Sequence, residues 1–416
     1  MTSARDGAPP FLTRVQIQNY RSIAACDVRL GPLTVLAGPN AAGKSNFLDA
    51  IRYIHDALGS SPGQALESRG GLQEVLHRGR SGQADSFRIR LEIRLRPERT
   101  HLPHMLKAAY TVEVGTHPQG GHSPVVRREE LEEIDGHSYA DGSGPRLVWQ
   151  PEEAALEPVL LPREARDELV LPRTTRSNRE TRALYRYLRR MRFYELLTPV
   201  LRAVDDTPGS RGVQPLGERG ESLARVLHAL AREYPWAKET IDGYLATMID
   251  NAVGLDGVEV PEADLALVVG RFRGEDGQIV KVDRRSLSEG TLRLAAVLAA
   301  LFQPEALTGD IPFVGIEEPE ISLHPPMLGA LYDALVAAAD NTQVVVTTQS
   351  ADLLDNAAAD PEHLLVVRDD GTGSVIGPID QAGRRLLGEG VLTLPELLRS
   401  GELRPVLPQP GAGEDR

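Results

Sequence analysis

The sequence predicts an α/β fold built around a phosphate-binding loop, and three observations support this prediction. Residues 38–45 read GPNAAGKS, a full match to the P-loop pattern G-x-x-x-x-G-K-[ST]. An apolar run of strand length, 33–37, precedes the loop, and apolar residues at helical spacing follow it. Two further apolar runs, 311–316 and 344–348, have strand length and end in polar residues.

The residue types of the loop suit triphosphate binding. Its backbone N–H groups point inward around the phosphates, and Gly43 lets the backbone approach them closely. Lys44 supplies a charge for the β- and γ-phosphates, and Ser45 offers a hydroxyl ligand to Mg²⁺. The following helix points its N-terminus at the phosphates, where its dipole favours negative charge. A chance match in a glycine-containing turn is disfavoured because both flanks fit.

Upstream of the loop, residues 12–17 alternate apolar and polar, as a half-exposed strand does. Asn19-Tyr20-Arg21-Ser22 follows this run. Arg21 could lie near the phosphates or pair on the surface, and spacing alone favours the surface.

Two acids end the apolar run at 311–316. Glu317 occupies the position of the Mg²⁺-holding acid of a P-loop ATPase, where Asp is more usual. Glu318 is placed to polarise the attacking water. Acids that merely cap a strand are the plain alternative, and it is disfavoured because a P-loop lies in the same chain.

A helix start lies some twenty residues before that strand, at Leu287-Ser288-Glu289-Gly290-Thr291. Ser288 can cap this helix, and such a helix start can also receive an anion. Taken alone, the cap is the better interpretation. The order of the two elements is that of ABC-type ATPases, and it favours nucleotide contacts from Ser288 and Gly290.

The third apolar run, 344–348, ends at Gln349, where a side chain usually senses the γ-phosphate in this class. Gln349 can donate a hydrogen bond but cannot take up a proton at neutral pH. His324 is another candidate polar group near the acids, although such a histidine more often caps or packs a turn.

Composition limits the class of protein. The chain has 416 residues and a net charge of −13, so any DNA binding must use a local patch. A single cysteine, Cys26, excludes an intramolecular disulfide and a Cys-based zinc cluster. No signal-peptide core and no run of about 18 apolar residues is present, so we expect a cytoplasmic protein without a membrane partner.

We expect five segments along the chain. Residues 1–10 form a flexible tail. Residues 11–115 hold the N-terminal part of an ATPase head with the P-loop. Residues 251–370 hold its C-terminal part, with the signature residues 287–291 and the helix that they start, the tandem acids Glu317 and Glu318, and the switch residue Gln349. Residues 116–250 form an insertion or lid that is partly helical. Residues 371–416 form a short hairpin or helix and a tail.

The clearest pattern outside the ATP site is a run of arginines in the insertion. Seven of them would share one broad helical face, and all but the last fall three or four apart: Arg173, Arg176, Arg179, Arg182, Arg186, Arg189 and Arg190. A basic stripe in an acidic protein is a candidate contact to the DNA backbone, with Arg182, Arg186 and Arg189 at its centre. A solvated face paired with nearby acids is the slightly favoured alternative.

On these motifs the chain resembles the RecF-like and OLD-like ATPases of the ABC/SMC superclass. The matching residues are Asn19 to Ser22, Gly38 to Asn46, Leu287 to Thr291, Glu317 to Glu320, Leu323 to Pro325 and Thr347 to Ser350. The resemblance implies a two-lobed head of ABC-ATPase type that binds ATP and Mg²⁺ between the two heads of a homodimer. Each P-loop then faces Ser288–Gly290 of the other subunit, and hydrolysis by Glu318 releases the dimer.

The resemblance also implies which side chains touch the nucleotide. It places Arg21, Asn40 and Asn46 near it, together with Gly38, Gly43, Lys44 and Ser45 of the P-loop. Two departures, Glu289 for a glycine of the signature and Glu317 for Asp, bear on turnover rather than on ATP binding. The glutamine that couples the lobes has only a weak candidate, Gln73. About 65 residues follow Gln349, so we expect no OLD-type nuclease domain in this chain.

Two functions remain as hypotheses. The leading one is an ATP-hydrolysing dimer that acts on DNA, or controls a DNA-acting partner, in repair or anti-phage defence. The second is an ATP-gated switch with slow or no turnover that assembles with a separately encoded effector such as a nuclease. The motor of a membrane transporter is disfavoured.

Overall fold

The computed structural model describes residues 11–80, 82–95, 106–116, 123–133, 147–149, 167–175, 179–206 and 215–407. Its central sheet has six strands in the order β10-β14-β15-β3-β16-β17. Five strands are parallel, and β17 is antiparallel to β16. Their bounds are β10 Arg192–Tyr194, β14 Phe313–Glu317, β15 Gln343–Thr348, β3 Leu33–Ala37, β16 Leu364–Asp369 and β17 Ser374–Gly377.

The central strands are apolar along their length because both faces of the sheet are covered. In β15, Val344 and Val346 belong to one hydrophobic core and Val345 to the other. In β3, Val35 and Leu36 divide in the same way. The two cores therefore lie on opposite faces of one sheet, and the carboxyl ends of the parallel strands meet along a single edge.

A second sheet covers one side and is antiparallel, in the order β2-β1-β6-β7-β8-β9. Its strands are β1 Phe11–Tyr20, β2 Ile23–Arg29, β6 Ser86–Leu95, β7 Leu106–Thr116, β8 Pro124–Glu133 and β9 Leu147–Trp149. The helices of this lobe are α1 Lys44–Gly59, α2 Pro62–Glu67, α3 Leu72–Val75, α4 Leu171–Thr174 and α5 Arg179–Arg190. A two-stranded ribbon joins β4 Arg78–Gly79 to β5 Gly82–Gln83.

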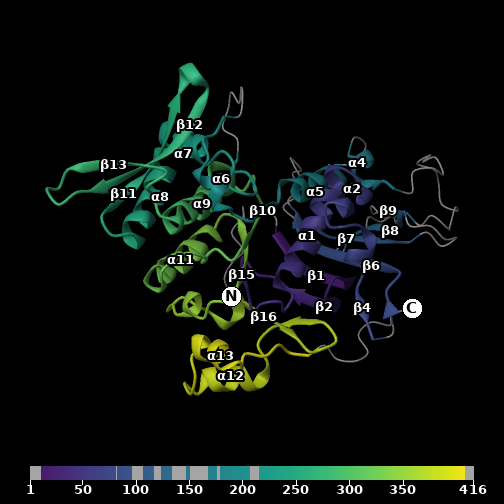
Figure 1. Cartoon of the computed structure of the whole chain (residues 1–416). Coiled ribbons are helices and arrows are strands. Elements are labelled where there is room, and N and C mark those ends of the chain that lie inside the picture. The colour runs from purple at the N-terminus through teal and green to yellow at the C-terminus, as the bar shows by residue number, and fades with distance from the viewer. Residues whose placement is uncertain are drawn as a thin grey trace.

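The other lobe combines helices with a three-stranded sheet, β11-β12-β13. The strands are β11 Ala252–Val260, β12 Leu265–Arg273 and β13 Ile279–Asp283. The helices are α6 Thr198–Arg202, α7 Leu223–Glu233, α8 Pro235–Met248, α9 Glu289–Phe302, α10 Pro304–Leu307 and α11 Pro325–Ala338. Figure 1 shows this lobe and the antiparallel lobe on either side of β15.

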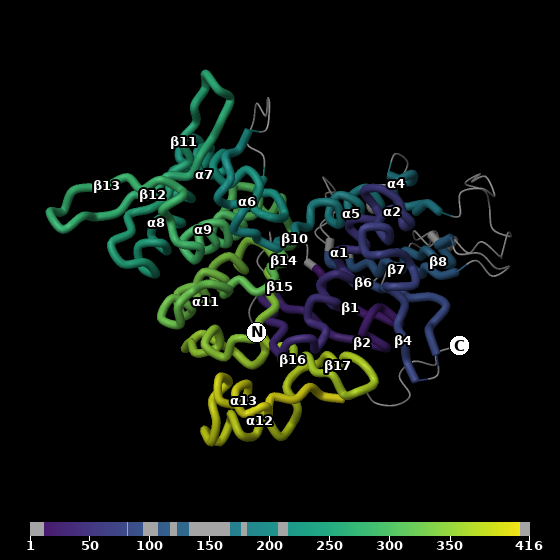
Figure 2. The backbone as a smooth tube through the Cα atoms, in the orientation of Figure 1, coloured from purple at the N-terminus to yellow at the C-terminus, as the bar shows by residue number. Residues whose placement is uncertain are grey.

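The C-terminal elements, α12 Gln381–Gly388 and α13 Leu394–Ser400, lie together beside β16 and β17, as the backbone trace in Figure 2 also shows. Short 3₁₀ turns occupy Pro261–Ala263, Asp352–Leu354 and Pro361–His363. None of the helices in the described part of the chain is long and apolar enough to cross a membrane.

The expected local elements are confirmed. The predicted strand 33–37 is β3, and β16 and β17 form an antiparallel hairpin. The helix predicted to start within residues 287–291 is α9, which begins at Glu289. The range 116–250 contributes β8 to the antiparallel sheet and β10 to the central sheet, in addition to its helices.

A buried carboxylate fastens the segment before α5 to the antiparallel sheet. Glu129 on β8 is fully buried, and it accepts hydrogen bonds from the Tyr110 hydroxyl at 2.8 Å and from the backbone N–H groups of Val170 and Leu171 at 2.5 and 2.9 Å. Burial raises the pKa of Glu129, while these three donors counteract part of that rise.

Candidate functional site

The P-loop runs from the end of β3 to the start of α1. Gly43 precedes α1 with φ +101°, and no side chain caps the first turn of that helix, which leaves its N–H groups to an anion. The Lys44 ammonium donates to the carbonyl oxygens of Gly38 at 3.0 Å and of Pro39 at 2.9 Å. Burial lowers the pKa of Lys44, and the nearby carboxylates oppose this shift.

The loop rests on the C-terminal hairpin. A Cβ atom added at Gly38 would lie 2.1 Å from the carbonyl oxygen of Val367, and one at Gly43 would lie 1.9 Å from Ser374 Oγ. Both positions therefore require glycine, because the backbone of the loop touches β16 and the start of β17 directly.

A hydroxyl cluster lies beneath this contact. Ser22 Oγ and Ser374 Oγ are 2.6 Å apart, and the Asn46 amide donates to Ser22 Oγ at 2.6 Å. Through this hydrogen bond the Asn46 side chain helps to hold Ser22 against Gly43 of the loop. Ser22 and Ser374, 352 residues apart in sequence, meet beside Gly43.

The predicted metal ligands are adjacent. Ser45 Oγ donates to Glu317 Oε2 at 2.5 Å, which brings a hydroxyl from the P-loop to a carboxylate at the end of β14. Burial raises the pKa of Glu317, while the hydrogen bond from Ser45 lowers it. Oxygen ligands and a partly desolvated carboxylate fit Mg²⁺, since a cation would offset the cost of burying that charge.

The predicted base and switch residues also meet. Gln349 Nε2 donates to Glu318 Oε2 at 3.2 Å, which joins the residues after β15 and β14. The Glu318 N–H donates to the Thr347 carbonyl and hydroxyl oxygens, each at 3.1 Å, and Glu318 adopts φ +43°. The carboxylate is therefore held at the sheet edge by strand β15.

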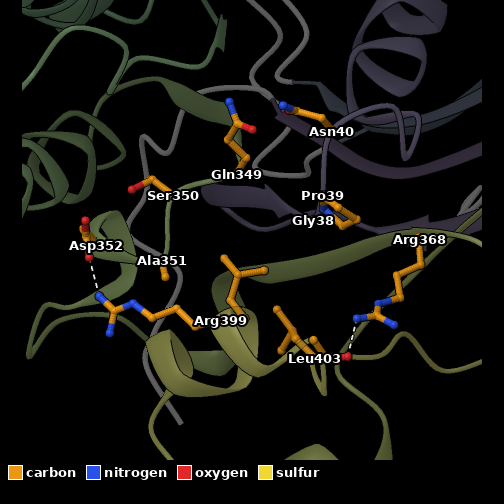
Figure 3. A pocket seen from close by; sticks show the side chains of 12 residues that line it. Gly38, Pro39, Asn40, Gln349, Ser350, Ala351, Asp352, Arg368, Arg399 and Leu403 are labelled. Carbon is orange, nitrogen blue, oxygen red and sulfur yellow. Dashed lines mark hydrogen bonds and ion pairs between the residues drawn. The ribbon is translucent and has the colours of Figure 1, made fainter.

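A cavity of about 520 Å³ opens beside the loop, between the P-loop, the residues after β15 and α13. Figure 3 shows Asn40 and Gln349 on one side of it. The opposite wall is held by an ion pair between Arg399 and Asp352 and by a hydrogen bond from Arg368 to Gly401.

The signature residues lie at the start of α9. Ser288 Oγ accepts from the Thr291 N–H at 3.1 Å and so caps the helix. Glu289 is exposed and accepts from Thr198 Oγ1 at 2.8 Å. Within the described residues of this chain, no hydrogen bond or ion pair given by the structure joins Ser288 or Gly290 to the P-loop.

Comparison with known proteins decides the family. A family model described as "AAA domain, putative AbiEii toxin, Type IV TA system" matches residues 33–355. The chain belongs to this family. Within it, the chain is an ABC/SMC-type P-loop ATPase related to RecF and OLD proteins.

Two curated relatives of this AAA-domain protein support that placement. It is 26% identical over 416 aligned residues to the DNA replication and repair protein RecF of Gloeobacter violaceus, with 88% of this chain and all of that protein covered. It is 50% identical over 44 residues to the OLD nuclease of Thermus scotoductus, which is 11% of this chain and only 8% of that nuclease.

Two solved structures share the fold. One is an SMC head bound to the C-terminal winged-helix domain of ScpA, with a TM-score of 0.53, 11% identity and coverage of 90% of this chain and 99% of that one. The other is an SMC head with an extended coiled coil, bound to the C-terminal domain of ScpA derived from Pyrococcus furiosus. Its TM-score is 0.51, its identity 12%, and the coverage is 92% and 99%.

Arg21 pairs with the P-loop helix. Its Nε lies 3.0 Å from Asp49 Oδ2 on α1, and its backbone N–H donates to the Val75 carbonyl at 2.6 Å. Arg21 adopts φ +49°. The side chain is therefore held one turn of α1 beyond the loop in this structure. His324 is exposed and precedes α11 without making a capping hydrogen bond.

The arginine run is divided among several contacts. Arg189 donates to the His55 carbonyl oxygen at 2.7 Å near the C-terminal end of α1, and Arg190 forms an ion pair with Asp310 at 2.6 Å. Arg182 is exposed, and its Nε donates to the Thr175 carbonyl at 2.8 Å. Arg186 is half-buried. Arg176 and the side chain of Arg179 lie outside the described residues.

Sequence reasoning missed Glu195. Strand β10 pairs with β14 so that Tyr194 lies opposite Ile316, which places Glu195 at the level of Glu317. The Glu195 carboxylate interacts electrostatically with that of Glu317. Gln73, by contrast, is exposed on α3. The available signal was the sequence Arg192-Phe193-Tyr194, too short and too close to the arginine run to be recognised as a strand.

Proposed function

We propose that this protein is an ATP-hydrolysing head that dimerises around ATP and Mg²⁺ and acts on DNA, or controls a DNA-acting partner, in repair or anti-phage defence. The observation that carries the proposal is the convergence of three pairs at one sheet edge. Lys44 lies on the P-loop carbonyls, Ser45 binds Glu317, and Gln349 binds Glu318. These are the groups that position a triphosphate, hold its metal and orient a water.

The geometry supports a separate role for each of these residues. When a triphosphate binds, the Lys44 ammonium would exchange its hydrogen bonds to the Gly38 and Pro39 carbonyl oxygens for contacts to the phosphates. The uncapped N-terminus of α1 supplies N–H donors. Ser45 and Glu317 would hold Mg²⁺, which would neutralise charge on the phosphate oxygens. Glu318 orients the attacking water, and Gln349 fixes the Glu318 carboxylate by donating to it.

Dimerisation completes the site. The Ser288 hydroxyl caps only the Thr291 N–H, so the N–H groups of Glu289 and Gly290 in the first turn of α9 remain to receive an anion from outside the chain. A second copy, related by a two-fold axis, would place its γ-phosphate there. The SMC-head fold supports this arrangement as an analogy.

The experiment is gel filtration of Glu318→Gln with ATP, with and without duplex DNA. ATP should shift this variant to a dimer, because binding persists while hydrolysis is blocked. Lys44→Ala is the matched control and should stay monomeric. If Glu318→Gln remains a monomer at saturating ATP, the dimer mechanism is wrong.

DNA contact is proposed for the exposed side of α5. Replacing Arg182 and Arg186 with alanine should lower the slope of log affinity against log salt by about two, near 0.9 for each lost phosphate contact. Arg190→Ala, which breaks only the ion pair with Asp310, is the matched control and should leave the slope unchanged. An unaltered slope in the double variant would assign the arginines to a solvated face.

A second candidate is an ATP-gated switch that assembles with a separately encoded effector such as a nuclease. Glu289 supports it, because an exposed carboxylate at the first residue of α9 opposes a phosphate bound there. Steady-state ATP turnover distinguishes the two candidates. Turnover that rises with DNA favours the DNA-acting dimer, and turnover that stays near zero with or without DNA favours the switch.

A further inference from the structure

The signature helix and the acid loop of the same chain are in direct contact. The acid loop is defined here as residues 318–324, between β14 and α11. A Cβ atom added at Gly290 would lie 2.4 Å from the Ser322 carbonyl oxygen, so the signature glycine packs against the backbone of this loop. The start of α9 therefore cannot shift without moving the residues that follow Glu318.

Arg293 joins these elements by hydrogen bonds. Its side chain leaves α9 one turn after Gly290 and is 7% exposed. Its Nε donates to the Ile321 carbonyl at 3.2 Å, and its Nη1 donates to the Leu196 carbonyl. One planar guanidinium thus holds the acid loop and the segment that leaves β10.

The segment after β10 holds the signature from its other side. Thr198 Oγ1 donates to Glu289 at 2.8 Å, and Arg202 Nη2 donates to the Leu287 carbonyl at 3.1 Å. Because β10 is paired with β14, this segment is fixed to the strand that ends at Glu317, directly before Glu318.

Charge links the same groups. The Glu318 and Glu320 carboxylates interact electrostatically with Arg293 on one side and with Lys44 on the other. The same two carboxylates therefore lie between the P-loop lysine and the arginine of the signature helix. A change of charge at Lys44 acts on acids that also face Arg293.

The backbone of the acid loop makes it suitable for transmitting such a change. Glu318 and Ser322 adopt φ +43° and +66°, left-handed conformations that are strained for a non-glycine residue and persist only where surrounding contacts fix them. Arg293 and Gly290 supply contacts at Ile321 and Ser322, inside this strained segment.

We propose that Arg293 is a positioning residue that couples the two ATP sites of the dimer. It ties the signature of each chain, which faces the nucleotide of the partner copy, to the acid loop of that chain, which faces its own nucleotide. This inference rests on the dimer under Proposed function. Occupancy of one site then raises the affinity of the other, and the effect is reciprocal.

The test is equilibrium binding of a fluorescent ATP analogue to Glu318→Gln and to Glu318→Gln/Arg293→Lys. Lysine keeps the charge but cannot reach both carbonyl oxygens with a rigid fork. At one protein concentration, the first should bind with a Hill coefficient between one and two, and the double variant with a lower coefficient, while still dimerising at saturating ATP. An unchanged Hill coefficient in the double variant would overturn the coupling and leave the dimer intact.

Two controls separate the causes. If Glu318→Gln itself fails to dimerise with ATP, the proposed function fails rather than the coupling alone. If Arg293→Lys strongly lowers the urea midpoint of unfolding, the titration is repeated with Thr198→Val in place of Arg293→Lys. Thr198→Val removes the hydroxyl that donates to Glu289 and keeps the shape of the side chain. A reduced Hill coefficient in that variant supports the coupling, and an unchanged one overturns it.

Discussion

Gly43→Ala tests how the P-loop is supported. The new Cβ atom would lie 1.9 Å from Ser374 Oγ, 2.8 Å from Ser374 Cβ and 2.7 Å from Ser22 Oγ. Neither serine can simply retreat, because the two hydroxyls are hydrogen-bonded and Ser22 also accepts from Asn46. The substitution therefore strains the backbone and separates the loop from its support.

The expected size of the effect follows from these contacts. A left-handed backbone costs an L-residue about 1–2 kcal/mol. Loss of the hydrogen bond between Ser22 and Ser374 costs about 1 kcal/mol, and a hydroxyl left without a partner costs about 1–2 kcal/mol more. We expect the free energy of unfolding to fall by about 3–5 kcal/mol if the loop keeps its position. If the loop moves instead, part of that loss appears as weaker nucleotide binding.

Urea unfolding measures the loss of stability, and titration with a fluorescent ATP analogue measures the loss of nucleotide affinity. Gly277→Ala is the matched control, since Gly277 has φ +79° with open space around it, and should cost only about 1–2 kcal/mol. Ser374→Gly removes two of the three close atoms, so the double variant should recover at least about 1 kcal/mol relative to additivity. A Gly43→Ala protein that matches Gly277→Ala in stability and binds nucleotide normally would refute the reasoning.

Three further predictions concern single acidic or basic groups. Lys44→Ala should abolish binding of the fluorescent ATP analogue, and retained binding would remove Lys44 from the site. Glu195→Gln should weaken Mn²⁺ binding by about tenfold in the presence of a non-hydrolysable ATP analogue, as measured by electron paramagnetic resonance. Glu218→Gln is the control. Equal Mn²⁺ affinities of Glu195→Gln and the unaltered protein would contradict a metal role for Glu195. Glu129→Gln should flatten the pH dependence of urea unfolding. Burial raises the folded-state pKa of Glu129 above about 4.5, so its contribution to stability is largest below that pH and falls as pH rises through the folded pKa; parallel curves would contradict this.

Local patterns carried most of what the sequence could predict. The P-loop, the acids after β14 and the helix capped by Ser288 each depend on residues within a few positions of one another, and the structure has these elements where they were expected. Burial on both faces made the central strands recognisable as continuous apolar runs. The contacts among the P-loop, the acids and Gln349 follow because the carboxyl ends of parallel strands lie at one edge of the sheet.

Pairing between residues far apart in the chain limited what the sequence could predict. Strand β10 has three residues and exists because it pairs with β14, so Glu195 could not be placed from its neighbours. Arg189 was grouped with a basic stripe, but it donates to His55 on α1, 134 residues away. Arg293 is a single charge in an apolar stretch of the sequence, and its two carbonyl partners belong to other segments.

The support beneath Gly43 bears on where this protein can be shortened. The family match ends at residue 355, yet Ser374 and strands β16 and β17 lie beyond it. At the other end, Leu12 lies before the matched range, and its backbone exchanges two hydrogen bonds of 2.8 Å with the Gln343 side chain. A recombinant fragment cut to 33–355 would expose an edge of β3 and lose both serines under the loop. Fragments for binding studies should therefore keep residues 11–407, with boundaries set by hydrogen bonding rather than by sequence similarity.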